Sequence, residues 1–582
     1  MSELKLVSSD GMRIAWDVPI LMSDGVTLRA DIFLPEKEGK YPVLMGQSPY
    51  GKGVQFQDPK GSYAFFWKML TDMKPEVLAG NTNKYQAWEQ CNPERWTKHE
   101  YAVMRIDSRG SGRSEGILDV YSARETRDYY ECIEWAAAQD FCTGKVGLLG
   151  ISYLAINQWQ VAAMRPPHLA AICPVEGCCD FYREWAYHGG IRHSFTRRWY
   201  PEQVTNLQHG VGERYQVVNP NTGELVSGPE TLSDDELKEN HNDLATNMNA
   251  HTLCDGYYKE LNADLSKIEV PLLSSGNWGG QHLHLRGNIE GYLNAGSKQK
   301  WLELHGLQHF TEFYTDYGES MQRRFFDHFL KGLDTWSDQP PVKLRLRKVD
   351  GSFVDRGENE WPLARTQWTK FYLNPAKGTL TKDIPEDVQE CSFKATEGGI
   401  DCFSEPLTEE MEITGPAMTK LFISSSTSDA DIFVTLRVLD PEGKDVTFIG
   451  TTDPHTVVAS GFLRASHRAL DEKKTLPYRP YHKHTSVDPL VPGEVYDLDV
   501  EIIPTSVIIP AGYRFGISIR GRDFELPGDG PWPVGLGVTF RGNASHVHDD
   551  PDDRDRPEMQ GVTTLHNQPE KHPYLMLPVI PG

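Results

Sequence analysis

The hydrophobic periodicity of this chain changes at about residue 340, and that change constrains the fold more than any other feature. Before it, short apolar runs such as residues 41–46 (YPVLMG) and 101–107 (YAVMRID) alternate with amphipathic stretches such as residues 125–139. Strands interleaved with helices are typical of a mostly parallel sheet covered by helices. The first part of the chain is therefore predicted to be an α/β domain.

The second part has the pattern of antiparallel strands. In residues 495–502 (VYDLDVEI), apolar and acidic residues alternate with a period of two, and residues 432–438 show a similar alternation before the turn segment DPEGKD. A period of two indicates strands with one buried and one solvated face. We expect a β-sandwich here.

Residues 181–264 interrupt the α/β pattern. They are rich in Asn, His, Trp and charged residues and contain no buried-strand signal, whereas strand signals return after residue 265 and a helix ends on Gly332. We therefore expect an α/β domain in residues 1–180 and 265–335, a helical cap in residues 181–264, and the sandwich in residues 340–582.

Composition narrows the classes of partner. The formal net charge is −23, which repels nucleic acid and anionic membrane surfaces. The chain shows no signal peptide and no apolar run of the ~20 residues that a membrane span needs. Nine cysteines, an odd number without paired CxxC motifs, favour reduced thiols. We expect a soluble cytoplasmic protein that acts on a small molecule; the sequence leaves open whether it forms a homo-oligomer.

Ser152 lies where a nucleophile is expected. In residues 144–155 (GKVGLLGISYLA) a buried strand runs through Gly150 into Ser152 and then into a helical pattern. This strand, turn and helix is the context of a nucleophile elbow, which lifts a serine hydroxyl above the sheet. The second glycine of GxSxG is replaced by Leu154, and a serine that merely caps a helix is the alternative.

Several motifs together resemble the family of cocaine esterase, glutaryl acylase, α-amino acid ester hydrolase and Xaa-Pro dipeptidyl peptidase. They are SPYGK (48–52), DSRGSGRSEG (107–116), GKVGLLGISYLA (144–155), GNWGGQHLHLRG (276–287) and GFLRASHR (461–468). The resemblance spans nearly the whole chain. It implies an α/β hydrolase domain with a cap and a C-terminal jelly roll, and a reaction that needs no cofactor and no metal.

The resemblance also implies roles for individual residues. The Tyr50 hydroxyl and the backbone N–H of Tyr153 would bind the oxyanion of a tetrahedral intermediate, where preorganised donors stabilise developing charge. The base that accepts the serine proton should be a histidine after the last core strand. His309 matches the family position, and His305, at the strand end, is the alternative.

The acid of the triad is missing from its usual place. The family carries an aspartate in a WxD segment, but this chain reads Trp278, Gly279, Gly280. We expect Glu176, at the end of the strand that follows the nucleophile helix, to replace it. Pairing of Glu176 with an arginine such as Arg183 is the structural alternative.

Other carboxylates remain as substitutes for the missing acid, and two residues are expected to contact substrate. Asp180 is the second choice of acid, and Glu312 and Asp316 could serve if their loop folds back toward His309. Trp278 and Asp180 are the candidate substrate-binding residues.

The function predicted from these residues is a serine hydrolase that cleaves an ester or amide bond through an acyl-enzyme. An acyltransferase or lactone-forming enzyme would use the same intermediate. A catalytically impaired binding protein would explain Gly280. A metal-dependent hydrolase built on three HxH pairs is the remaining alternative; the pairs are His282 with His284, His482 with His484, and His546 with His548.

Overall fold

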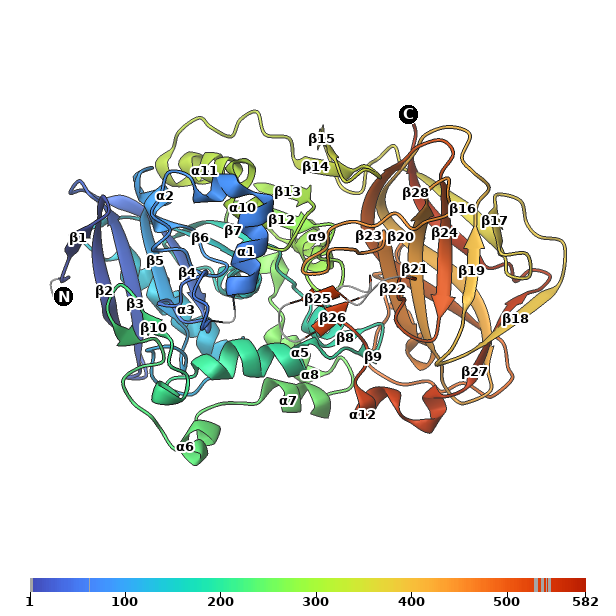
Figure 1. The fold of residues 1–582 in the computed structure, drawn as a ribbon, viewed down its shortest axis with the longest axis horizontal. Coiled ribbons are helices and arrows are strands. Elements are labelled where there is room, and N and C mark those ends of the chain that lie inside the picture. Colours follow the sequence, from blue (N-terminus) through green and yellow to red (C-terminus); the bar gives the residue numbers. More distant parts are fainter. Residues whose placement is uncertain (1–3, 62, 528–531, 535–537, 541, 543–545) are drawn as a thin grey trace.

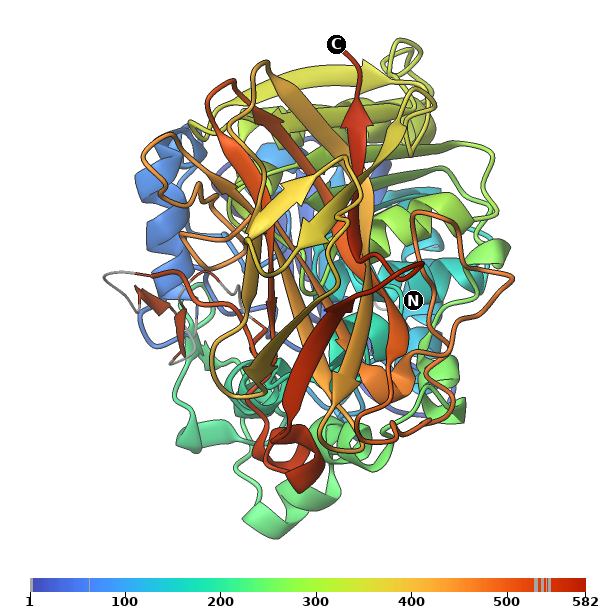
Figure 2. The same cartoon turned by 90° about the vertical axis from the view of Figure 1, so that its right-hand side faces the viewer.

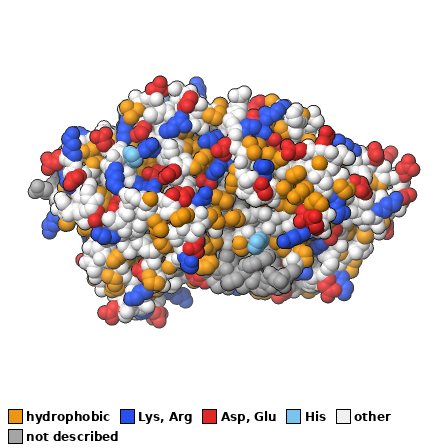
Figure 3. Space-filling model, turned by 45° about the horizontal axis from the view of Figure 1, so that its top comes forward, with side chains coloured by type: hydrophobic (Ala, Val, Ile, Leu, Met, Phe, Trp, Pro, Cys, Tyr) orange, Lys and Arg blue, Asp and Glu red, His pale blue; other side chains and the backbone are white. Residues whose placement is uncertain are grey.

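The structure is a computed structural model that describes residues 4–61, 63–527, 532–534, 538–540, 542 and 546–582. Figure 1 shows two halves, each built around a large sheet, with the N-terminal half on the left and the C-terminal half on the right. Within the described ranges no helix is long and apolar enough to cross a membrane. On the face shown in Figure 3, acidic and basic side chains are interspersed over both halves.

The first half contains an 11-stranded sheet with the order β1-β2-β3-β5-β4-β6-β7-β12-β13-β14-β15. Its first three strands are β1 (Val7–Ser9), β2 (Met12–Leu21) and β3 (Thr27–Pro35). The seven strands that lie between β3 and β15 in this order pair in parallel, whereas the strands at both edges pair antiparallel. The parallel strands are β5 (Ala102–Asp107), β4 (Tyr41–Ser48), β6 (Cys142–Ile151), β7 (Leu169–Val175), β12 (Leu272–Asn277), β13 (Lys300–His305) and β14 (Val342–Arg347).

Successive side chains of the parallel strands point to opposite faces of the sheet and belong to two separate hydrophobic clusters. In β4, Leu44 belongs to the cluster that includes Phe326 of helix α11 (Asp316–Lys331). Its neighbours Val43 and Met45 belong to the cluster that includes Ile133 of helix α3 (Ala123–Ala137). Strands buried on both faces read as continuous apolar runs, which is why β4 and β5 stand out in the sequence.

The first sheet extends further along the chain than expected. β14 pairs with β13, and β15 (Phe353–Glu358) pairs with β14, so both belong to this sheet. The boundary expected at residue 340 therefore falls before two strands that still belong to the α/β half. The alternation in β14 explains the difference: Lys343 and Arg345 lie on a partly exposed face of the sheet, so the strand has the pattern of a sandwich strand.

The second half is a sandwich built from an 11-stranded sheet, which is antiparallel except where β17 (Thr379–Thr381) pairs with β19 (Ile400–Phe403); this half faces the viewer in Figure 2. Its central strand β20 (Met411–Ser425) pairs with β23 (Tyr496–Ile509) and also with β28 (Tyr574–Ile580), which closes the sheet on itself. In β23, Leu498, Val500 and Ile502 are fully buried. This architecture confirms the fold class, an α/β domain followed by a β-sandwich.

Residues 181–264 form short helices, two short strand pairs and loops, which run along the bottom of Figure 1 from beneath the first sheet to the sandwich. The helices are α5 (Phe195–Trp199), α6 (Asp234–Glu239), α7 (Leu244–Ala250) and α8 (Gly256–Leu261). This segment packs closely on the sandwich: the Arg464 N–H donates to the Gly189 carbonyl at 2.8 Å, and a Cβ on Gly189 would lie 2.0 Å from the Phe462 carbonyl oxygen.

Candidate active site

Ser152 occupies a strained turn between β6 and helix α4 (Tyr153–Ala163). Its φ of 56° and ψ of −112° are a conformation that residues with a side chain rarely adopt. The Ser152 N–H donates to the Val175 carbonyl at 3.0 Å, which holds the turn against β7. Backbone strain of this kind persists only where the surroundings impose it, and it is concentrated at functional sites.

The departures from GxSxG are accommodated by neighbouring glycines. Leu154 takes the place of the second glycine, and its side chain fills the space beside Gly46 and Gly150, where an added Cβ would come within 2.6 and 2.4 Å of it. Ala155 likewise faces Gly177, where a Cβ would lie 2.7 Å from the Ala155 Cβ. The larger residues of the elbow are therefore matched by the absence of side chains opposite them.

Strand order brings the remaining candidates together. β6, β7, β12 and β13 are consecutive in the sheet and parallel, so their carboxyl ends share one edge. Ser152 follows β6, Glu176 follows β7, Gly280 follows β12 and His309 follows β13. Ligands of open α/β sheets bind at this edge.

Glu176 and His309 form a direct pair. His309 Nδ1 lies 2.8 Å from Glu176 Oε2, and both side chains are buried. Burial alone would raise the pKa of Glu176, but the charge of His309 and hydrogen bonds from His305 and His309 outweigh it and lower that pKa to about 2. Burial would lower the pKa of His309, but the carboxylates of Glu176 and Glu89 raise it to about 10.

Two residues fix the Glu176 carboxylate from behind. Asn277 Nδ2 donates to Glu176 Oε1 at 3.1 Å, and His305 Nε2 lies 3.4 Å from the same oxygen. His305 is buried, and its other ring nitrogen bonds Glu303 at 2.8 Å, so both of its ring nitrogens contact carboxylates. Arg183, the arginine considered as a partner of Glu176, bonds Asp180 instead.

Gly280 leaves the space that Glu176 fills. A Cβ on Gly280 would lie 3.3 Å from Glu176 Oε2 and 3.7 Å from the His284 Cβ. A carboxylate at position 280 and the carboxylate of Glu176 would thus compete for one place beside His309. Of the other acids considered, Glu312 is paired with Arg345 at 2.5 Å, and Asp316 is 84% exposed with Arg95 at 3.6 Å.

The structure adds two residues that the sequence did not suggest. His284 Nε2 lies 3.2 Å from Ser152 Oγ, and its ring stacks on that of His309 with centroids 5.1 Å apart. Glu89 Oε1 lies 2.9 Å from His309 Nε2. The only sequence signal at His284 was its HxH spacing, which pointed to metal binding, and Glu89 lies in a loop without periodicity or motif.

Tyr50 and Tyr153 pack against each other beside the elbow, with ring centroids 5.7 Å apart. The Tyr50 hydroxyl accepts from Trp199 Nε1 at 3.1 Å, so a helix of the cap positions it. Burial raises the pKa of Tyr50, and the charge of Glu89 raises it further, which keeps the hydroxyl protonated as a donor must be. The side chain of Tyr153 bonds Glu125 at 2.6 and 2.7 Å, which leaves its backbone at the start of α4 as the part next to Ser152.

Trp278 faces away from the reacting groups. Its indole donates to the Arg345 carbonyl at 2.8 Å, and its ring packs beside Trp361 with centroids 6.1 Å apart, in a buried cluster with β14. The structure thus gives Trp278 a packing role at the edge of the sheet, rather than the substrate contact expected from the sequence.

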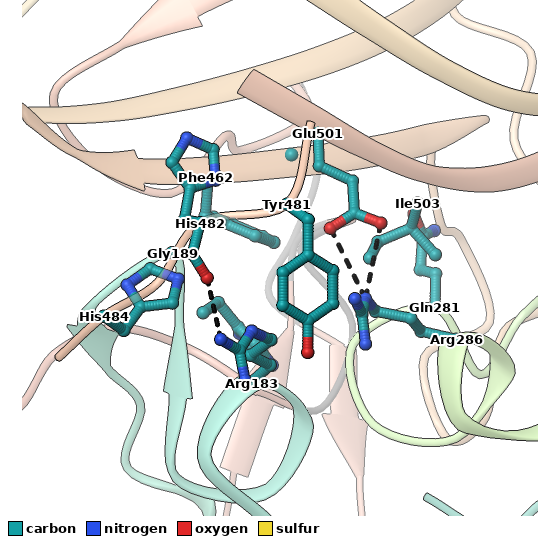
Figure 4. Close-up of a pocket in the computed structure, with 12 residues that line it drawn as sticks. Arg183, Gly189, Gln281, Arg286, Phe462, Tyr481, His482, His484, Glu501 and Ile503 are labelled. Carbon is teal, nitrogen blue, oxygen red and sulfur yellow. Dashed lines mark hydrogen bonds and ion pairs between the residues drawn. The ribbon is translucent and has the colours of Figure 1, made fainter. Parts of the chain in front are cut away.

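Arg183, the partner of Asp180, lines a small cavity between the cap and the sandwich (Figure 4). The cavity measures about 40 Å³ and is lined in part by Arg183, Arg286 and Tyr481. Asp180 bonds Arg183 Nη1 at 2.8 Å and accepts the N–H groups that begin the cap. Burial would raise the pKa of Asp180, but Arg183 and Arg286 lower it. Its charge is therefore already neutralised within the cap, whereas a substrate amine would need a free carboxylate.

A loop of the sandwich contacts both catalytic loops. The His309 N–H donates to the Thr451 carbonyl at 3.1 Å, and the Thr451 N–H and hydroxyl donate to the Gly279 carbonyl at 3.2 and 3.0 Å. A Cβ on Gly279 would lie 2.6 Å from the Gly450 Cα. The second half of the molecule thus holds the loops that carry His309 and Gly280.

The HxH pairs do not form a recognisable metal centre. His188 Nδ1 lies 2.9 Å from His548 Nε2, and His467 lies 3.1 Å from His484, so these rings bond one another. No group of three or more His, Cys, Asp or Glu side chains among the residues that the structure describes is arranged to hold a metal ion.

Comparisons with known proteins agree with this architecture. Residues 24–311 match the family model of the X-Pro dipeptidyl-peptidase (S15 family), and residues 334–576 match that of the X-Pro dipeptidyl-peptidase C-terminal non-catalytic domain. A CocE/NonD family hydrolase from Staphylococcus aureus superimposes with a TM-score of 0.82 and 29% identity, covering 98% of this chain and 94% of that one.

Two further relatives extend this comparison. The cocaine esterase of a Rhodococcus species is 24% identical in an alignment that covers 97% of this chain and 98% of the esterase. An α-amino acid ester hydrolase, 17% identical, covers 98% of each chain with a TM-score of 0.69 and shares the fold.

Proposed function

The chain belongs to the cocaine esterase and Xaa-Pro dipeptidyl peptidase family of serine hydrolases, and from this premise we propose that it cleaves a small ester or amide through an acyl-enzyme on Ser152. The observation that carries the proposal is the His309 to Glu176 pair at 2.8 Å, on loops that follow β13 and β7, two strands of the same parallel run as the Ser152 strand β6. A buried histidine and carboxylate beside a strained serine supply a nucleophile, a base and the group that orients the base.

The proposed reaction has two halves. Ser152 Oγ attacks the acyl carbon, its proton passes to the His309 and Glu176 pair, and that proton is then given to the leaving alcohol or amine. Water repeats the sequence on the acyl-enzyme and releases the acid. The Tyr50 hydroxyl and the Tyr153 N–H donate to the oxyanion in both halves, where each such donor is worth roughly 3 to 4 kcal/mol.

Glu176 takes the part that an aspartate at position 280 has in relatives. Its position next to Gly280 supports this, because a Cβ there would touch Glu176 Oε2. Gly280 alone suggested a catalytically impaired binding protein. That alternative assumes that no carboxylate orients the base, whereas Glu176 would supply one.

Fluorophosphonate labelling tests the proposal. We expect wild-type protein to be labelled on Ser152, Ser152→Ala to remain unlabelled, and Glu176→Gln to be labelled roughly 10³ to 10⁴ times more slowly. Glu312→Gln is the matched control: it alters a buried carboxylate of the same region that bonds Arg345, and should keep the wild-type rate. Absence of labelling in folded wild-type protein, or labelling that survives Ser152→Ala, would refute a Ser152 hydrolase.

A further inference from the structure

Both ring nitrogens of His309 face carboxylates. Nδ1 lies 2.8 Å from Glu176 and Nε2 lies 2.9 Å from Glu89, and all three side chains are buried. A serine hydrolase needs the Nε2 atom to receive the nucleophile's proton. In this arrangement Glu89 holds that atom, so the proton of Ser152 has no direct route to His309.

Glu89 is anchored to the elbow itself. Its carbonyl accepts the Ile151 N–H at 3.1 Å, and its φ of 60° turns the chain so that the side chain reaches the site. The Ser152 hydroxyl is close enough to the carboxyl group to contribute to its pKa, together with His309. Glu89 therefore bonds His309 through its side chain and the residue before Ser152 through its backbone.

The two oxygens of Glu89 have different surroundings. Oε1 bonds His309 Nε2, whereas Oε2 is buried and has no hydrogen-bond partner within the part of the chain that the structure describes. A buried carboxylate oxygen without a hydrogen bond destabilises the fold, so a role in the reaction would explain why it is kept.

Burial raises the pKa of Glu89 to about 7, and His309 and Ser152 only partly offset this effect. A carboxyl group with such a pKa exchanges protons readily at neutral pH.

The other neighbour of Ser152 is a poor base. His284 Nε2 lies 3.2 Å from Ser152 Oγ, but burial and the charge of His309 lower the pKa of His284 well below its usual value. Its Nδ1 atom, also buried, has no partner among the described residues that could stabilise an imidazolium. His284 can orient the serine hydroxyl, but it cannot hold its proton for long.

We propose that Glu89 is a catalytic residue that relays the Ser152 proton to His309, an inference that rests on the hydrolase function proposed above. At rest the proton shared by His309 Nε2 and Glu89 Oε1 lies on His309, and the reactive form is the tautomer in which it has moved across the 2.9 Å contact to Glu89 Oε1. As Ser152 Oγ bonds the acyl carbon, its O–H bond breaks and the proton joins Glu89 Oε2, while the Oε1 proton passes to His309 Nε2. Glu89 ends as it began, with one proton, and Glu176 stabilises the imidazolium. The reverse transfer protonates the leaving group.

Glu89→Gln and Glu89→Ala test the relay in the full-length protein. Glutamine keeps the size of the side chain and a hydrogen bond to His309 but cannot take up and release a proton in this way. We expect both variants to be labelled by fluorophosphonate, and to hydrolyse p-nitrophenyl acetate, at least ~100-fold more slowly than wild type. We expect added formate to restore part of the rate in Glu89→Ala, which a merely structural role would not allow.

The outcomes separate this inference from the proposed function. Wild-type labelling on Ser152 together with an unchanged or faster rate in Glu89→Gln would overturn the relay, since Glu89 would then only obstruct His309, while the hydrolase would stand. Slow labelling of Glu89→Ala without formate rescue, at wild-type melting temperature, would also overturn it. Failure of Ser152 labelling in the wild type would remove both.

Discussion

The replacement of the usual aspartate by Glu176 can be tested by moving the carboxylate back. The change is Gly280→Asp, made in the wild type and in Glu176→Gln. A Cβ at position 280 would lie 3.3 Å from Glu176 Oε2, and an aspartate carboxylate begins one bond beyond Cβ, so its oxygens would reach the place from which Oε2 accepts the His309 Nδ1–H. One carboxylate can occupy this place well, and two cannot.

The expected magnitudes follow from these distances. Two carboxylates about 4 Å apart repel by about 4 kcal/mol at an effective dielectric constant of about 20. Gly280→Asp alone should therefore lower the melting temperature and slow labelling, or force one of the two groups to hold a proton. Glu176→Gln alone should slow labelling by roughly 10³ to 10⁴. Adding Gly280→Asp to Glu176→Gln should recover at least tenfold, because a single carboxylate again orients His309.

The assay is the fluorophosphonate labelling rate of the four proteins, with melting temperatures as the control for folding. The same substitution should thus harm the wild type and help the glutamine variant, a reversal of sign that indicates direct coupling. If Gly280→Asp is harmless in the wild type and brings no recovery in Glu176→Gln, Glu176 is not the orienting acid.

Three further predictions concern stability and binding. The pKa of Glu176 falls from 4.5 to about 2, so its pairing with His309 is fully stabilising above pH 4.5 and is lost as the pH falls toward 2. The pKa of His309 rises from 6.5 to about 10, so the stability that His309 gains from the pair is complete below pH 6.5 and is lost as the pH rises through 10. The melting temperature should therefore be highest between pH 4.5 and 6.5. Glu176→Gln should make the melting temperature depend less on pH. Arg464→Ala should lower the free energy of unfolding in urea by about 3 to 5 kcal/mol, because the buried carboxylates of Asp431 and Asp553 both lose their bonds to this guanidinium, whereas exposed Arg522→Ala should lower it little. Trp278→Phe should lower the free energy of unfolding by about 1 kcal/mol, because the hydrogen bond to the Arg345 carbonyl is lost, and should leave KM unchanged. A KM raised several-fold would instead support the substrate contact expected from the sequence.

The sequence predicted those features that depend on local pattern. Helix α3 spans Ala123–Ala137 against an expected 125–139, and its start is set by Ser122, whose side chain accepts the Glu125 N–H. Helix α11 ends at Gly332 with φ of 75°, as its glycine indicates. Ser152, Glu176 and His309 could be named because each follows a buried strand, and parallel strands bring such positions to one edge.

Residues that depend on tertiary packing could not be predicted in the same way. Glu89 reaches Ser152 only through a loop whose backbone bonds Ile151, a contact between segments far apart in sequence. The direction of the Trp278 ring is set by β14 and Trp361, and β14 itself was assigned to the other domain. Local periodicity carries no information about such contacts.

The contacts of Thr451 have a consequence for how this protein can be divided. The family description of residues 334–576 speaks of a non-catalytic domain, yet Thr451 holds the His309 backbone and the Gly279 carbonyl. An excised N-terminal half would keep every reacting side chain and lose the brace that fixes two of its loops. We therefore expect chimaeras of two relatives to keep activity only where both sides of this contact come from the same parent.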